Sequence, residues 1–200
     1  WYGVQEIGDL NRYGLEKVFS DIEENHPVKL PNFIRLLEWI LFYIIRGINQ
    51  EHAPTHYTFV KRMLQLDDCI ITFNYDIIID QVLWNISAED GNKIYWHPAS
   101  GYGIPFNGYT NQNANDNTVH PLEYANSNVK IYKLHGSLGW IDVESNFPIL
   151  YLSKTTEGNL RLAQKGYLKK QIFIVPPIRN KEFPEWIEKL WIDAEDSLMK

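Results

Sequence analysis

ITFNYD, residues 71–76, ends an apolar run with an amide and a carboxylate. The run CIITFN (69–74) predicts a buried strand, and the apolar residues after Asp76 predict a helix that continues to about Trp84. A buried amide or carboxylate without a partner destabilises a protein, so the presence of Asn74 and Asp76 at the end of this run has two possible explanations. Either the strand ends in a turn and Asp76 caps the next helix, or the strand carries both groups into a ligand crevice.

Helical and strand patterns alternate along the rest of the chain. Apolar residues at helical spacing predict further helices at 14–25, 32–50, 54–68 and 182–200. Apolar runs bounded by turn residues predict strands at 128–137, 148–153 and 171–177. Strands separated by helices predict an α/β fold with a Rossmann-like, mainly parallel sheet flanked by helices. We expect one domain over residues 1–200, in which residues 87–128, rich in Asn, Gly, Tyr and Ser, form a loop-rich insertion.

The composition limits the classes of protein and of site. Hydrophobic residues make up 44% and aromatic residues 14% of the 200 residues, which is enough for the core of one domain. A net charge of -6 argues against a nucleic-acid-binding face. The uncharged apolar run at 39–45 is much shorter than the ~20 residues that cross a bilayer. The single cysteine, Cys69, excludes an internal disulfide and a zinc site of several thiolates, and we expect a cytoplasmic domain that binds neither membrane nor nucleic acid.

A second polar group, His135-Gly136-Ser137, lies at the end of the predicted strand 128–137. Ligands of parallel α/β sheets bind outside the carboxyl ends of the strands, so two polar clusters at strand ends predict a site. The alternative is a polar turn in which Gly136 takes a positive φ and Ser137 caps. Elsewhere, His52 and His56 have the spacing of a helical metal pair, but a proline separates them and no third ligand is evident, so no metal site is expected.

A resemblance to a known family joins the two clusters. ITFNYD followed by KLHGSLGW (133–140) resembles the sirtuin-like domains of bacterial antiphage defence proteins. Sirtuins carry a Thr-Gln-Asn-x-Asp motif, matched here by Thr72, Asn74 and Asp76, and a His-Gly motif, matched by His135 and Gly136. IFIVPPIRNKEF (172–183), followed by a helix that contains tryptophan, also resembles the family. The likeness covers roughly residues 15–200, and its specific part is the two motifs.

The chain departs from the sirtuin pattern in three places. Phe73 replaces the sirtuin glutamine that lies near the ribose. The four cysteines of the sirtuin zinc lobe are absent, which fits the defence branch better than the protein deacylases. The glycine-rich loop that opens the family and holds the cofactor pyrophosphate is missing, and so is the family's closing segment. The resemblance therefore implies an internal fragment of a longer protein, without its phosphate-loop strand and its last strands.

The resemblance implies an NAD glycohydrolase that cleaves NAD to nicotinamide and ADP-ribose, without a metal, and depletes NAD in abortive infection. Asn74 would position a water or the ribose hydroxyls, and His135 would act as general base, because the ordinary pKa of histidine, ~6.5, suits proton transfer near neutral pH. Asp76 would hold the nicotinamide carboxamide. Further residues implied to line the NAD site are Thr72, Phe73, Gly136, Ser137 and Tyr102. A sensor or effector domain and a homo-oligomer are the implied partners, and Trp140 would pack beneath the motif.

Two other functions remain open. An NAD-dependent protein deacylase would need an acyl-lysine peptide to release nicotinamide, and the absence of a zinc lobe counts against it. A non-catalytic module would bind NAD or ADP-ribose and use both polar clusters as turns and caps. The residues also leave open whether NAD or NADP is the substrate, what triggers activity, whether residues 87–128 cover the site, and whether the fragment is active alone.

Overall fold

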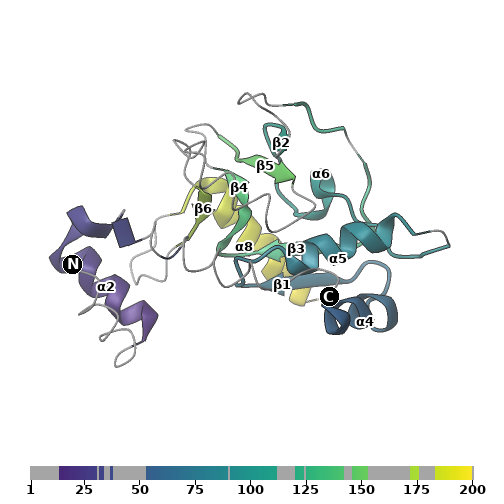
Figure 1. The fold of residues 1–200 in the computed structure, drawn as a ribbon, viewed down its shortest axis with the longest axis horizontal. Coiled ribbons are helices and arrows are strands. Elements are labelled where there is room, and N and C mark those ends of the chain that lie inside the picture. Colours follow the sequence, from purple (N-terminus) through teal and green to yellow (C-terminus); the bar gives the residue numbers. More distant parts are fainter. Residues whose placement is uncertain are drawn as a thin grey trace.

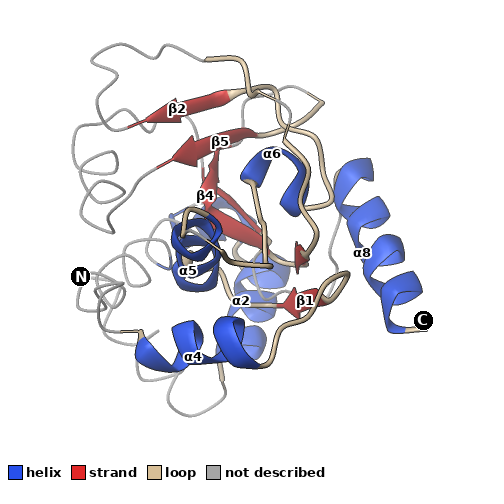
Figure 2. Cartoon of the chain, turned by 90° about the vertical axis from the view of Figure 1, so that its right-hand side faces the viewer, coloured by secondary structure: helices blue, strands red, loops and turns tan. Residues whose placement is uncertain are grey.

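The structure is a computed structural model with two small sheets and helices beside them, in which the N-terminal helix lies apart from the rest (Figures 1 and 2). It describes residues 14–30, 32–33, 37, 53–89, 91–111, 120–123, 125–141, 146–152, 172–175 and 183–199. Within these residues the fold is mixed α/β, as the alternation of helical and strand patterns predicts. No helix of the described part is both long and apolar enough to span a bilayer.

Most of the predicted helices are confirmed, with shifted ends. The helices are α2 (Leu15–Asn25), the 3-10 helix η1 (Pro27–Lys29), α4 (Pro54–Arg62), α5 (Ile78–Ser87), α6 (Pro98–Gly101) and α8 (Glu185–Leu198). The prediction of a helix over 54–68 is wrong after Arg62, because Asp68 accepts a hydrogen bond from the Gln65 N–H at 2.8 Å and Asp67 takes a positive φ of 66°. The predicted helix 32–50 lies largely outside the described residues.

The first sheet is a parallel pair that contains the strand predicted over 69–74, although this strand is half-buried rather than buried and ends at Thr72. Strand β1 (Cys69–Thr72) pairs with β3 (Lys130–Lys133), and Thr72 lies opposite Lys133. One residue further on, the Leu134 N–H donates to the Thr72 carbonyl at 3.0 Å. The two strands therefore end side by side, and the residues that follow them lie at one edge of the sheet.

The second sheet contradicts the prediction of a single, mainly parallel Rossmann-like sheet. It contains β2 (Tyr109–Asn111), β4 (Gly136–Ile141), β5 (Ile149–Leu152) and β6 (Ile172–Ile174) in the order β2-β5-β4-β6. Only β2 and β5 are parallel, while β4 runs antiparallel to both of its neighbours. The predicted strand 128–137 is in fact two strands, because the chain turns at Leu134-His135 and Gly136 takes a φ of 82° before β4 begins.

One hydrophobic cluster connects the sheets with α5 and α8. Fully buried side chains of β3 (Ile131), α5 (Leu83) and α8 (Leu190) belong to it, and each such side chain contributes about 1.5–3 kcal/mol to folding. Residues 87–128 include α6 and β2, and Trp96 and Tyr102 of this segment are buried in the same cluster. Both α6 and α8 contact β3, and these contacts hold the strand whose end carries His135.

Candidate functional site

The edge formed by the ends of β1 and β3 brings the two sequence motifs together. Phe73 follows β1 and His135 follows β3, and the centroids of their rings lie 5.0 Å apart with an interplanar angle of 64°. The loop after β1 is also joined to β4, because the Leu138 N–H donates to the Tyr75 carbonyl at 2.9 Å. The parallel pairing of β1 with β3, which lie next to each other in Figure 1, is what places the motifs side by side.

The amide and the imidazole of this edge are both accessible to solvent. The Asn74 side chain is exposed, while its backbone N–H donates to Thr72 Oγ1 at 3.0 Å and so fixes the turn after β1. The His135 side chain is partly buried. Both residues therefore keep some solvent exposure at the end of the sheet.

Asp76 is engaged in the start of α5. Its Oδ1 accepts a hydrogen bond from the Ile78 N–H at 3.0 Å, which satisfies one of the free N–H groups of the first helical turn. The N-cap residue of α5 is Ile77, so Asp76 lies one position before it and supports the start of the helix through this bond; the residue is half-buried.

Gly136 and Ser137 lie inside the fold rather than at its surface. A Cβ at Gly136 would lie 2.4 Å from the carbonyl oxygen of Phe173, so only glycine fits between the turn and β6. Ser137 is completely buried in β4, and its Oγ accepts a hydrogen bond from the Gly139 N–H at 3.2 Å. Trp140, three residues further along β4, is fully buried. These residues shape the turn that presents His135.

Sequence reasoning missed a buried charged network behind this edge. Lys133, with no exposed side-chain surface, forms an ion pair with Asp80 of α5 at 2.9 Å and also donates to the backbone carbonyl of Asp76. The Tyr102 hydroxyl donates to the other oxygen of Asp80, and burial together with this carboxylate raises the pKa of Tyr102 well above its usual value. Tyr102 therefore lies in the core, away from the surface of the strand-end edge. The signal for this network is Lys133 itself, the last residue of a strand with buried neighbours.

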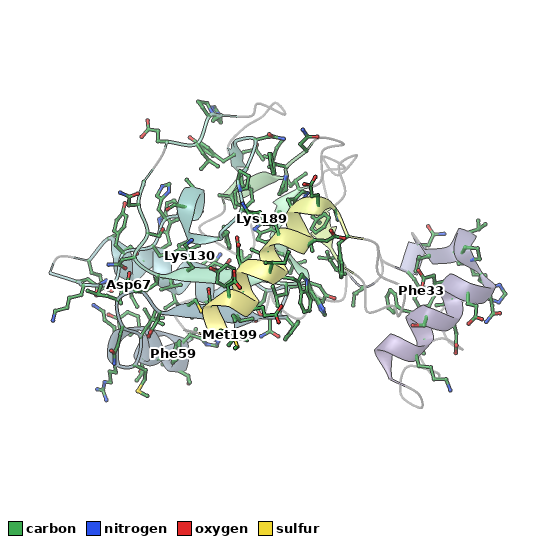
Figure 3. All side chains as sticks on the ribbon, turned by 180° about the vertical axis from the view of Figure 1, so that it is seen from behind. Phe33, Phe59, Asp67, Lys130, Lys189 and Met199 are labelled. Atoms are coloured by element: carbon green, nitrogen blue, oxygen red, sulfur yellow. The ribbon has the colours of Figure 1, made fainter. Side chains whose placement is uncertain are left out.

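Trp191 of α8 also lies at this site, which the sequence did not indicate. Its indole Nε1–H donates to the carbonyl of Leu134 at 3.1 Å, directly before His135. Its ring lies 6.2 Å from the His135 ring and 5.8 Å from the Phe73 ring, between centroids. Helical spacing predicts only that Trp191 packs on a core face, and its position beside His135 follows from the way α8 crosses the sheets (Figure 3).

A separate hollow of about 550 Å³ lies beside the start of α8 and does not include Asn74 or His135. Its walls include the rings of Phe173 and Trp186, whose centroids are 4.6 Å apart, and Lys189 lies at it from the next turn of α8. Lys189, labelled on this helix in Figure 3, is exposed. The hollow and the strand-end edge therefore share α8 as a common wall.

No group of three or more His, Cys, Asp or Glu side chains within the described ranges could hold a metal ion. His56 is exposed on α4, and His52 lies outside the described residues. His97 has a structural role, because its Nδ1 accepts a hydrogen bond from the Ala99 N–H at 3.2 Å at the start of α6, and burial lowers its pKa.

Comparisons of the chain with protein-family models, with curated proteins and with solved structures returned no match. The strand-end edge offers an exposed amide, a partly exposed imidazole and two aromatic rings at the ends of adjacent parallel strands. Such a set can orient a polar ligand, accept a proton and contact a planar ring.

Proposed function

We propose that the chain is an NAD glycohydrolase domain that cleaves NAD to nicotinamide and ADP-ribose. The observation that carries the proposal is the parallel register of β1 and β3, which puts Asn74 and His135 after neighbouring strand ends. These two residues come from the motifs that resemble the sirtuin-like domains of antiphage defence proteins. In that setting the activity would deplete NAD during abortive infection, in the cytoplasm, with a sensor or effector domain and a homo-oligomer as partners.

The reaction needs a group that positions a water and a group that accepts its proton, and this edge carries a candidate for each. The bond between nicotinamide and ribose breaks through a transition state that resembles an oxocarbenium ion, and its electron pair leaves with neutral nicotinamide. A water oxygen then bonds to the anomeric carbon and gives up a proton. Asn74 would hold that water or the ribose hydroxyls, since an amide both donates and accepts hydrogen bonds, and His135 would take the proton.

Asp76 retains its bond to the start of α5 in this proposal and is also the candidate partner of the nicotinamide carboxamide. Asp76→Asn separates the two roles, because asparagine supports the start of a helix about as well as aspartate. We expect this variant to keep the stability of the wild type and to lose affinity for NAD. Equal affinity would leave Asp76 with the support of the helix alone.

A non-catalytic module that binds NAD or ADP-ribose is the second candidate. One observation favours it: Asp76, Gly136 and Ser137 all have structural roles in capping or turning the chain, and the hollow beside α8 excludes Asn74 and His135. A module of this kind needs the fold of the edge but no proton transfer, so it would bind the dinucleotide without releasing nicotinamide.

Nicotinamide release from NAD by the intact protein separates the candidates. We expect Asn74→Ala and His135→Ala to abolish release while unfolding at the temperature of the wild type. Asn85→Ala, at an exposed position of α5, and His56→Ala, at an exposed position of α4, are matched controls that should keep full activity. Binding of NAD without release, unchanged by the two site variants, would favour the binding module.

A further inference from the structure

The two halves of the strand-end edge are joined by a buried side chain. Lys133 is the last residue of β3, two positions before His135, and its side chain has no exposed surface. Its Nζ donates to the backbone carbonyl of Asp76, in the loop between β1 and α5, and forms an ion pair with Asp80 of α5 at 2.9 Å. One side chain therefore connects the strand that leads to His135 with the loop that carries Asn74.

The loop over residues 73–77 carries both Asn74 and Asp76, and it has neither helical nor strand structure. Two of its hydrogen bonds are local, from the Asn74 N–H to Thr72 Oγ1 and from the Ile78 N–H to Asp76 Oδ1. Local bonds shape the loop but do not place it relative to the rest of the edge. A backbone bond to β4 holds its middle, and the bond from Lys133 to the Asp76 carbonyl holds it to β3.

Stability alone does not account for an ion pair at this position. Transfer of two charges out of water offsets much of their attraction, and apolar residues of similar volume often stabilise a buried site equally well or better. Two apolar side chains could replace Lys133 and Asp80, but neither could donate to a backbone carbonyl. The bond to Asp76 is therefore what the lysine adds. Asp80 compensates the lysine charge, and the Tyr102 hydroxyl donates to its other oxygen, so the network is satisfied and favours one conformation.

We propose that Lys133 is a positioning residue, which holds the Asp76 carbonyl and thereby places the loop 73–77, with Asn74, relative to His135. Lys133 is fully buried and acts only through this loop. The effect on the loop is independent of any ligand, whereas the effect on the reaction rests on the proposed function. Misplacement of an orienting group by about 1 Å can slow a reaction roughly a hundredfold, so a displaced loop should lose activity although the fold remains.

Two variants change stability and the loop in opposite directions. The apolar double variant, Lys133→Met/Asp80→Leu, removes both charges together, so it should fold stably while the Asp76 carbonyl loses its donor. The amide variant, Asp80→Asn, keeps the bond from Lys133 to that carbonyl, and its amide can accept from Lys133 and donate to the Tyr102 hydroxyl. Because it leaves the lysine charge buried without a carboxylate, it should unfold at a lower urea concentration than the apolar double variant.

Amide hydrogen exchange measures the loop without a ligand. In the apolar double variant the Asn74 and Ile78 N–H groups should exchange roughly ten- to hundredfold faster than in the wild type, the factor expected for loss of a hydrogen bond from a charged donor. In the amide variant they should stay close to the wild type. The Gln65 and Tyr95 N–H groups, which also bond to side-chain oxygens outside helices and strands, are controls for a change in global stability. Unchanged exchange at Asn74 and Ile78 in the apolar double variant, relative to these controls, would overturn the proposal.

Nicotinamide release from NAD, measured where each variant is folded, tests the consequence for the reaction. We expect kcat/KM to fall about ten- to hundredfold in the apolar double variant and to change little in the less stable amide variant. A purely structural role of Lys133 predicts that activity follows stability, and that order would overturn the positioning role. If the amide variant does not fold, exchange and release in the apolar double variant decide.

The two measurements keep this proposal apart from the proposed function. A wild type that releases no nicotinamide would overturn the hydrolase, and exchange at Asn74 and Ile78 would still decide whether Lys133 places the loop. Release that is unchanged in the apolar double variant would leave the hydrolase standing and overturn the positioning role.

Discussion

Replacing Lys133 by methionine tests the buried network that supports the strand-end edge. Lys133 has no exposed side-chain surface and Asp80 has 5%, so the variant leaves a carboxylate buried without its cation. Removing one partner of a buried ion pair costs about 3–5 kcal/mol, which is a large part of the roughly 5–15 kcal/mol that stabilises a typical domain. The Asp76 carbonyl also loses its donor, so the loop between β1 and α5 should loosen.

A double variant separates the effect of the unpaired buried charge on stability from the effect of the changed side-chain shape. In Lys133→Met/Asp80→Leu both charges are gone, and replacement of a buried pair by apolar residues is often close to neutral. The Tyr102 hydroxyl then lacks its acceptor, which costs about 1–3 kcal/mol. We therefore expect the double variant to be more stable than Lys133→Met, and the addition of Tyr102→Phe to restore stability further.

Urea unfolding followed by far-ultraviolet circular dichroism measures these differences as free energies of unfolding. Lys61→Met is the matched control, because Lys61 pairs with Glu89 on the surface at 2.5 Å and its loss should leave the unfolding midpoint nearly unchanged. A Lys133→Met variant as stable as the wild type would refute the reasoning. So would a double variant that is less stable than the single one.

Three further predictions concern backbone strain and titration. Gly136→Ala should lower the melting temperature much more than Gly91→Ala, because both have positive φ but only at Gly136 would the new Cβ meet the Phe173 carbonyl, at 2.4 Å. Burial raises the pKa of Tyr75 to about 12, above the unfolded value near 10, so the stability it contributes is complete below pH 10 and is lost as the pH rises towards 12; Tyr75→Phe should flatten that part of a pH–stability curve. Burial lowers the pKa of His97, so stability should fall as the pH drops below about 6.5, and His97→Asn, which can still cap α6, should remove this fall in thermal melts.

The strand-end edge could be predicted from sequence because its signals are local. The apolar run that stops at Asn74, followed by a helical pattern, predicts β1, although the strand already ends at Thr72. The run over 128–137 predicts β3 but not its end, which lies at Lys133. Strands separated by helices favour parallel pairing, and β1 and β3 do pair in that way. That the two strands are neighbours is a finding of the structure, because strand patterns alone do not fix the order of strands in a sheet.

The second sheet and the charged network depend on contacts that local patterns do not contain. The turn that ends β3 is set by Gly136, whose positive φ, offered by the sequence as one alternative, is confirmed at 82°. Its close contact with β6 appears only when 172–174 are in place. Lys133 and Asp80 form their ion pair between a strand and a helix far apart in the chain, so each charge taken alone resembles a surface residue. The same holds for Trp191, which reaches the Leu134 carbonyl from α8.

Release of nicotinamide from NAD by the intact protein, beside its His135→Ala form, tests the central claim most directly. If the edge formed by β1 and β3 is the site of cleavage, the wild type releases nicotinamide and the variant does not, while both melt at the same temperature. Release that continues in the folded His135→Ala variant, or a wild type that binds NAD and releases nothing, would contradict the claim.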